Sequence, residues 1–374
     1  MSSRVLRTLA VFLIGPILLA LAACGGNGIK VCNELCCGSD AACPAPLPLL
    51  YADGLDGHIA AFPVNPGTGA LGTSTTTPGP AQSLGMAALG NQFLYASNSQ
   101  TALVDAWSIT PNTGALAQVN GSPFNLGAFS VAGGLAVNNS AQVLYVADAG
   151  RIDALKIDGM GALSPITGSP FSSESSLFLT IDPDTRFVFA ADIDPPGAVA
   201  AFTIDPSTGA LAAVPGSPFP ADPGGSITSP FGVVVDSTGN FVYAVLNTTN
   251  QVAAFSIISS SGALNPVPGS PFTAGSRPLS LATTRNLLYV ANALDGTVSG
   301  YSIDPTTGVL SPLADSPFTI PAPALTIDPS GRFLYAAGGA GIMVFTIDPT
   351  TGALTQIAGS PFPAAGATVL TYVQ

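Results

Sequence analysis

The chain has 374 residues, of which 47% are hydrophobic and only 8% are charged, and it contains 42 Gly and 34 Pro. This composition is too apolar for a disordered chain and too rich in turn-forming residues for a helical protein, so it predicts an all-β fold. The net charge is −12 with only 9 Lys and Arg residues, which excludes the basic surface that nucleic-acid binding requires.

The first residues have the order of an export signal. Arg4 and Arg7 precede an apolar run from Thr8 to Ala20, which is too short to span a bilayer comfortably, and Leu21-Ala22-Ala23-Cys24 follows. Residues 1–23 therefore resemble a bacterial lipoprotein signal peptide, and the resemblance implies cleavage before Cys24 and lipid on that cysteine. Its acyl chains would anchor the chain to an envelope membrane, because each buried CH₂ contributes about 0.8 kcal/mol. An ordinary signal peptide with an incidental cysteine is the alternative.

Residues 24–46 form a predicted cysteine-rich tether. Four more cysteines occur here: Cys32, Cys36, Cys37 and Cys43. An even number of close cysteines in an oxidising compartment most often forms disulfides, so we expect two bridges. Their pairing is open, although a bond between the adjacent Cys36 and Cys37 is sterically unfavourable. A four-thiolate metal site is the alternative, but the Cys-x-x-Cys pairs of a zinc ribbon are absent.

Seven copies of one module fill residues 47–374. Each copy has a marker glycine in a Gly-x-Leu step, at Gly69, Gly114, Gly161, Gly209, Gly262, Gly308 and Gly352. Several alternating apolar runs between these glycines favour four antiparallel strands per copy and a β-propeller over any helical repeat. The sequence therefore predicts one seven-bladed β-propeller over residues 47–374.

The last complete copy shows the predicted strand order. We expect strands A to D at Leu325–Ile327, Phe333–Ala336, Met343–Ile347 and Leu354–Ile357. Asp-Pro turns at Asp328 and Asp348 join A to B and C to D, because Asp accepts backbone N–H groups and the following Gly supplies a positive φ. The first copy lacks strand A, and Ala367–Val373 has the missing pattern, so we expect the C-terminus to close the ring and remove its open edges.

Six copies end in a Ser-Pro-Phe triplet. The aromatic residues of these triplets are Phe124, Phe171, Phe219, Phe272, Phe318 and Phe362. Because they recur once per blade, we interpret them as wedges that pack between blades rather than as a ligand-stacking site.

The repeats resemble a known family. Leu288-Tyr289-Val290-Ala291-Asn292, Ile303-Asp-Pro-Thr-Thr-Gly308 and the Gly-Ser-Pro-Phe motif are similar to the lactonase-type seven-bladed propellers, the family of bacterial 6-phosphogluconolactonase and the fungal carboxymuconate-lactonising enzyme. Members credited with lactonase activity tend to carry a Pro-His-x-His stretch. This chain lacks it: His58 is the only histidine, and Glu34 and Glu174 are the only glutamates. The obvious general base is therefore missing.

The predicted topology places the B–C and D–A loops together, on the face opposite both families of Asp-Pro turns. Four long polar side chains of these loops are candidate catalytic residues for a lactone. His58 or Glu174 would activate water, and Arg151 and Arg277 would hold an anionic substrate and the developing oxyanion. The residue types alone favour the alternative, in which all four are ordinary solvated loop residues.

No other chemical motif stands out. The chain has no Gly-x-Ser-x-Gly elbow and no phosphate-binding loop. Asp53-Gly-Leu-Asp56 and Asp192-Ile-Asp194 hint at a cation site, but no full ligand set is contiguous, so we expect no metal and no cofactor. We expect an exported, lipid-anchored monomer of the cell envelope, without enzymatic activity, whose loop face binds a protein, a glycan or a small molecule. A lactone hydrolase is the alternative function.

Overall fold

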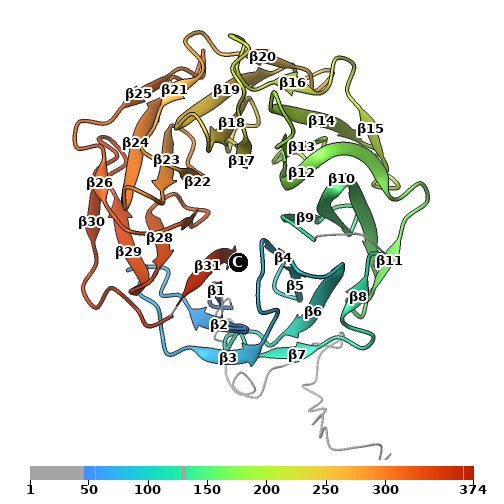
Figure 1. Cartoon of the computed structure of the whole chain (residues 1–374). Coiled ribbons are helices and arrows are strands. Elements are labelled where there is room, and N and C mark those ends of the chain that lie inside the picture. Colours follow the sequence, from blue (N-terminus) through green and yellow to red (C-terminus); the bar gives the residue numbers. More distant parts are fainter. Residues whose placement is uncertain (1–45, 55, 128–131, 365) are drawn as a thin grey trace, which may run out of the picture. The chain divides into compact units, whose positions relative to one another are not determined.

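The computed structural model describes residues 46–54, 56–127, 132–364 and 366–374 (Figure 1). The predicted signal peptide lies outside these residues, and so do Cys24, Cys32, Cys36, Cys37 and Cys43. The lipid anchor and the disulfides accordingly stay predictions. Within the described residues, no helix has the length and hydrophobicity needed to cross a membrane.

Seven blades surround a central opening, with strand A of each blade innermost (Figure 1). Blade two consists of β4 (Met86–Leu89), β5 (Phe93–Asn98), β6 (Leu103–Ile109) and β7 (Leu116–Gln118). Blade five consists of β17 (Pro230–Val235), β18 (Phe241–Leu246), β19 (Gln251–Ile257) and β20 (Leu264–Pro266). Blade six consists of β22 (Pro278–Thr283), β23 (Leu287–Asn292), β24 (Thr297–Ile303) and β25 (Leu310–Pro312). Blade seven consists of β27 (Ala324–Ile327), β28 (Phe333–Gly338), β29 (Gly341–Ile347) and β30 (Leu354–Gln356).

Blades three and four share one sheet. It contains β9 (Leu135–Asn138), β10 (Val143–Ile157), β11 (Leu163–Pro165), β12 (Phe171–Ile181), β13 (Phe187–Asp192), β14 (Ala198–Ile204) and β15 (Leu211–Ala213). β10 includes strands B and C of blade three, since the chain reverses at Gly150 (φ 87°) and Ile157 N–H donates to Gln142 O. β12 pairs with β10 and then with β13, which joins the blades. Four short strands pair with strand C of their own blade: β8 (Phe124–Asn125) with β6, β16 (Phe219–Pro220) with β14, β21 (Phe272–Thr273) with β19 and β26 (Phe318–Thr319) with β24.

The C-terminal strand completes blade one. β31 (Ala367–Val373) pairs with β1 (Leu49–Gly54), and the sheet continues through β2 (His58–Pro63) and β3 (Thr75–Pro78). The antiparallel register runs from Leu49 opposite Val373 to Asp53 opposite Val369. The predicted all-β, seven-bladed propeller closed by its C-terminal strand is confirmed.

The Asp-Pro turns have the expected hydrogen bonds. The Asp348 carboxylate accepts the backbone N–H groups of Thr351 and Thr350 at 2.7 and 2.9 Å, and these bonds lower the pKa of Asp348. In the A–B turn, Asp328 Oδ1 accepts the N–H groups of Arg332 and Phe333 at 2.9 and 2.7 Å. The aspartates therefore hold the turns, which place the B–C and D–A loops on the opposite face.

Neighbouring blades pack through seven buried apolar clusters, one at each junction. The rings of the Ser-Pro-Phe triplets lie against six of these clusters, which confirms them as wedges between blades. The serine of each triplet accepts a backbone N–H of strand C, as Ser122 Oγ does from Ala106 at 2.9 Å. Among the described residues, the cluster between blades one and two has no such ring, because Thr77 stands opposite Ile59 where the other blades have the phenylalanine.

A hydrogen bond that the sequence analysis did not anticipate links blade to blade. In six blades the tyrosine of strand B donates its buried hydroxyl to the carbonyl of the marker glycine in the next blade. The pairs are Tyr51 and Gly114 (3.0 Å), Tyr95 and Gly161 (3.0 Å), Tyr145 and Gly209 (2.7 Å), Tyr243 and Gly308 (3.0 Å), Tyr289 and Gly352 (2.7 Å), and Tyr335 and Gly69 (3.3 Å). Blade four carries Phe189 at this position, so Gly262 receives no such bond.

We expect Tyr243→Phe to lower the free energy of unfolding by about 1 kcal/mol, because it removes a buried hydrogen bond and leaves Gly308 O unpaired. The matched change Phe189→Tyr should raise it by a similar amount, since it adds the seventh bond. Urea unfolding of both variants and of the parent measures these differences. Unchanged stability in both variants would show that these hydroxyl groups make no measurable contribution.

Candidate functional site

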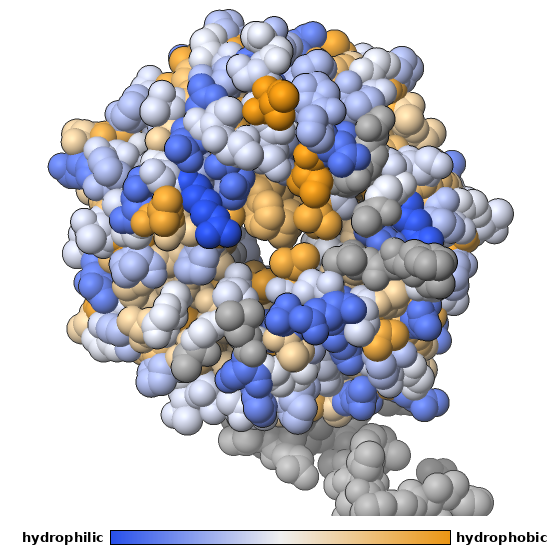
Figure 2. Space-filling model, viewed as in Figure 1, coloured by the Kyte–Doolittle hydropathy of each residue, from blue (hydrophilic) through white to orange (hydrophobic). Residues whose placement is uncertain are grey.

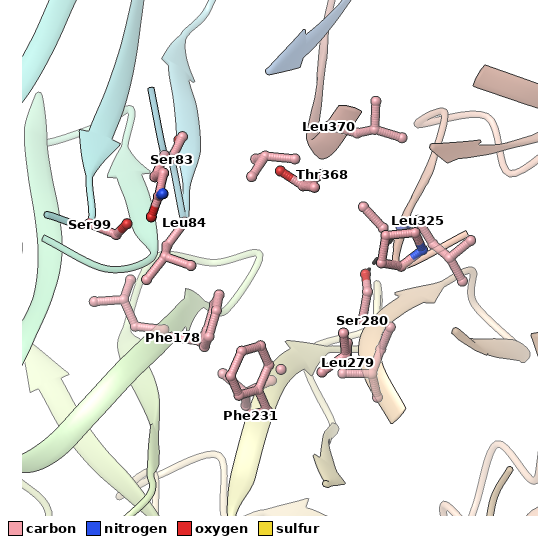
Figure 3. A pocket seen from close by; sticks show the side chains of 18 residues that line it. Ser83, Leu84, Ser99, Phe178, Phe231, Leu279, Ser280, Leu325, Thr368 and Leu370 are labelled. Atoms are coloured by element: carbon pink, nitrogen blue, oxygen red, sulfur yellow. Dashed lines mark hydrogen bonds between the residues drawn. The ribbon is translucent and has the colours of Figure 1, made fainter. Parts of the chain in front are cut away.

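The inner strands enclose a cavity of about 410 Å³ on the propeller axis (Figure 3). Its apolar wall includes Leu84, Phe178, Phe231, Leu279, Leu325 and Leu370, and its hydroxyl groups come from Ser83, Ser99, Ser280 and Thr368. The rings of Phe178 and Phe231 contact each other, with centroids 4.4 Å apart. Figure 2 shows the central opening with hydrophobic residues at parts of its edge.

No ionisable side chain lines this cavity among the described residues. The Ser280 hydroxyl accepts the Leu325 N–H at 3.1 Å, so part of its hydrogen-bonding capacity serves the strands themselves. Ser99 and Thr368 are partly exposed and can meet a ligand. The cavity can therefore hold an uncharged molecule and offer it a few hydrogen bonds, but it supplies no acid or base.

His58 lies at the start of β2, outside the lining of the cavity. Its side chain is 53% exposed, and its Nδ1 atom lies 3.1 Å from Asp56 O and 3.9 Å from Asp56 Oδ2. The local loop thus fixes the ring beside Asp56 on the B–C face.

Arg151 belongs to a buried ionic cluster at the junction of blades two and three. Its Nε atom lies 2.8 Å from Asp148 Oδ2 and 3.0 Å from Asp153 Oδ2, and a terminal nitrogen donates to Leu126 O at 3.0 Å. Both aspartates are buried. Burial raises the pKa of Asp153 to about 6, which the positive charge of Arg151 opposes. Arg151 therefore already balances two carboxylates of the protein.

The other two predicted residues lie in different crossovers. Glu174 is in β12, whose strand pairing places it beside the β10 turn that precedes Arg151; its side chain is outside the description. Arg277 is exposed in the crossover between blades five and six, and its N–H donates to Asn250 Oδ1 at 2.8 Å. Its guanidinium makes no ion pair within the described part of the chain. The catalytic roles suggested for these four residues stay predictions.

Several polar residues at the end of strand B are buried. Strand B runs two residues further than expected, to Gly338 in blade seven, so the residues that end it lie within the blade junctions. Asp148, Asp192 and Asn292 end their strands in this way. The repeat alignment carries this signal, since these residues follow the apolar core of strand B without a turn residue between them.

The comparisons with known proteins agree with this fold. Residues 217–325 match the sequence profile of a family described as "Lactonase, 7-bladed beta-propeller". No curated protein matches the chain significantly. A candidate 6-phosphogluconolactonase from Bacteroides fragilis has a similar structure, with a TM-score of 0.75, 21% identity, and coverage of 90% of this chain and 100% of that chain. The periplasmic gluconolactonase of Pseudomonas aeruginosa has a TM-score of 0.70 and 17% identity, with coverage of 88% of this chain and 99% of that chain.

The chain is thus a seven-bladed β-propeller, part of which matches the lactonase-type family. The family match is carried by the repeats of blades five and six and their flanks, and the similar solved structures extend the fold over the whole ring.

We expect Arg151→Met to lower the free energy of unfolding by about 3 kcal/mol at about pH 8, because two buried carboxylates lose their counter-charge. The loss should be smaller at about pH 5. The folded pKa of Asp153 lies above its unfolded value, so proton uptake by the folded state offsets the missing charge at low pH and is lost as the pH rises. Urea unfolding at both pH values tests this. Arg285→Met, in an exposed turn, is the control, and an equal loss at both pH values would contradict the electrostatic explanation.

Proposed function

We propose that this chain is a lipid-anchored, ligand-binding propeller of the cell envelope whose central cavity takes a small, largely apolar molecule. The observation that carries the proposal is the lining of the cavity: apolar side chains from several blades with a few hydroxyl groups, and no ionisable group among the described residues. Enclosed apolar cavities of several hundred Å³ with few polar groups are typical of ligand sites. Hydrolysis by acid–base catalysis needs an ionisable group within hydrogen-bond reach of the substrate.

The walls favour a particular class of ligand. The contacting rings of Phe178 and Phe231 suit an aromatic or aliphatic ring, and Ser99 and Thr368 suit a hydroxyl or carbonyl group on it. An ionised phosphate or carboxylate would lose its hydration without gaining a counter-charge. The ligand that fits is therefore a neutral ring compound with one or two oxygen substituents.

A neutral lactone has this chemistry, and so the alternative function of lactone hydrolase is retained as a second candidate. It is supported by the family match and by the likeness to a protein described as a periplasmic gluconolactonase. His58 or Glu174 would have to activate water, and Arg277 to stabilise the oxyanion. The engagement of Arg151 with Asp148 and Asp153 weighs against a part for that arginine.

We expect the uncharged fluorescent probe N-phenyl-1-naphthylamine to bind the parent protein with one site per chain. Thr368→Trp, which fills the cavity without removing a side-chain hydrogen bond, should weaken binding by about tenfold or more, equivalent to about 1.4 kcal/mol. Thr319→Trp, the same change on the exposed strand β26, should leave it unchanged. A fluorescence titration of the three proteins measures this.

Equal probe affinity in the three proteins would contradict binding in the cavity. The same preparations should hydrolyse glucono-lactone and 6-phosphogluconolactone no faster than buffer. Turnover that disappears in a His58→Ala, Glu174→Gln double variant would favour the hydrolase instead.

The anchor and tether belong to the same proposal. Lipid on Cys24 would hold the mature chain at the membrane, and two disulfides among Cys32, Cys36, Cys37 and Cys43 would stiffen the segment before the propeller. The negative net charge makes the folded domain itself a poor ligand for anionic lipid surfaces.

We expect Cys24→Ala to abolish incorporation of a radiolabelled fatty acid when the chain is expressed in a bacterial host, because the acceptor sulfur is removed. The variant should also move from the membrane fraction to the soluble fraction after cell lysis. Unchanged labelling of the variant would overturn the lipid anchor.

A further inference from the structure

The junction between blades one and two differs from the other junctions in its polar side chains. Asp53 from β1 and Asp105 from β6 both face it, as strand alternation shows: Asp53 lies two residues after Tyr51, and Asp105 two residues before Trp107. Both aromatic residues belong to the buried cluster of this junction. Among the described residues, this junction also lacks the aromatic wedge of the other six junctions.

Asp53 stands at a core position of strand B. The equivalent residues of the other blades are small and uncharged: Ser97, Ala147, Ala191, Val245, Ala291 and Ala337. The Asp53 side chain is 0% exposed, and neither of its carboxylate oxygens accepts a hydrogen bond. The neighbouring Ser83 hydroxyl donates to Gly85 O at 3.0 Å instead. A buried, unpartnered carboxylate is strongly unfavourable in a folded protein, so this group either holds a proton or is balanced by a counter-charge.

The acidity of Asp53 reflects this environment. Burial raises the pKa of Asp53 to about 7. The Ser83 hydroxyl and the Gly54 N–H, which lie nearby without hydrogen-bond geometry, oppose the rise, and the negative charges of Asp56 and Asp105 add to it. Burial also raises the pKa of Asp105. The two carboxyl groups therefore share one apolar junction and repel each other when ionised.

Two other junctions show how polar side chains at the ends of strand B and the start of strand C find partners. Between blades two and three, Arg151 balances Asp148 and Asp153. Between blades five and six the equivalent residues form a neutral network, in which the Asn292 amide donates to Thr297 Oγ1 at 3.1 Å and to Ser299 Oγ at 2.9 Å.

Blade two carries Asn98, Leu103 and Asp105 at the same three positions. Leu103 thus stands where blade three has its arginine, and Asp53 of blade one adds a second carboxylate. Within the described residues, no Lys, Arg or His forms an ion pair with Asp53 or Asp105. A counter-charge for the ionised pair would therefore come from a ligand.

We propose that a Ca²⁺ ion binds at this junction, held by the carboxylates of Asp53 and Asp105. Two carboxylates balance a divalent charge, and hard oxygen donors are the ligands that Ca²⁺ prefers. The described residues contain no group of three or more His, Cys, Asp or Glu side chains placed to hold a metal. The remaining ligands are then the Ser83 hydroxyl, backbone carbonyl groups and water, a mixed oxygen set that Ca²⁺ accepts and Zn²⁺ does not favour.

Terbium luminescence tests the site directly. Trp107 is the only tryptophan of the chain and lies two residues from Asp105 on the same side of β6, so its excitation should sensitise a Tb³⁺ ion bound there. The full-length chain, treated with EDTA and assayed at about pH 8, should show emission that saturates at one Tb³⁺ per chain and is displaced by Ca²⁺. Asp53→Asn and Asp105→Asn should each weaken Tb³⁺ binding by about tenfold or more.

Asp153→Asn is the matched control, because Asp153 occupies the position of Asp105 in blade three. It should keep the terbium emission whatever its effect on stability. No sensitised emission from the parent, or emission that both Asp53→Asn and Asp105→Asn retain, would overturn the proposal. If Asp53→Asn does not fold, Asp105→Asn decides, because Asp105 is only partly buried, and equilibrium dialysis with radioactive Ca²⁺ gives its stoichiometry directly.

Discussion

The contact between one blade and the next is the constraint on which the rest of this molecule depends. A blade buries one face of its sheet against each neighbour, and the tyrosine of strand B adds a hydrogen bond to the marker glycine of the following blade. Gly308 illustrates why that residue must be glycine: its φ is 74°, and a Cβ atom would lie 2.4 Å from the ring of Phe241. The marker glycine is therefore required by the packing between blades as well as by the positive φ of its own turn.

The same junctions decide what charged side chains can do. Polar residues at the ends of strand B and the start of strand C point between blades, where water is largely excluded and an ion needs a partner. Arg151 and its two aspartates satisfy that requirement with charge, and Asn292 with Thr297 and Ser299 satisfies it with neutral hydrogen bonds. Of the four candidate site residues, Arg151 is in this way engaged in holding two blades together.

The sequence predicts the parts of the structure that depend on local patterns. Strand order, Asp-Pro turns and the pairing of Ala367–Val373 with blade one follow from periodicity and turn chemistry, and the structure confirms them. The cavity and the junction clusters were not predictable in the same way, because they join residues from different blades. Tyr51 and Gly114 are 63 positions apart, so no window of one repeat contains both. The burial of Asp53 was missed for the same reason: its neighbours Ser83 and Asp105 belong to the next blade.

The placement of polar and apolar side chains in the ring determines which functions the cavity can support. Apolar inner strands line the axis, and the polar side chains of the cavity wall, among the described residues, are hydroxyl groups and the Gln82 amide. A fold arranged in this way can bind a neutral molecule without any residue beyond those that build its wall. Hydrolysis would also need a general base at the cavity. His58 lies beside Asp56, outside the lining of the cavity. Binding is therefore the function that the architecture supports with the fewest additional requirements, whereas hydrolysis would require an ionisable side chain to reach the cavity.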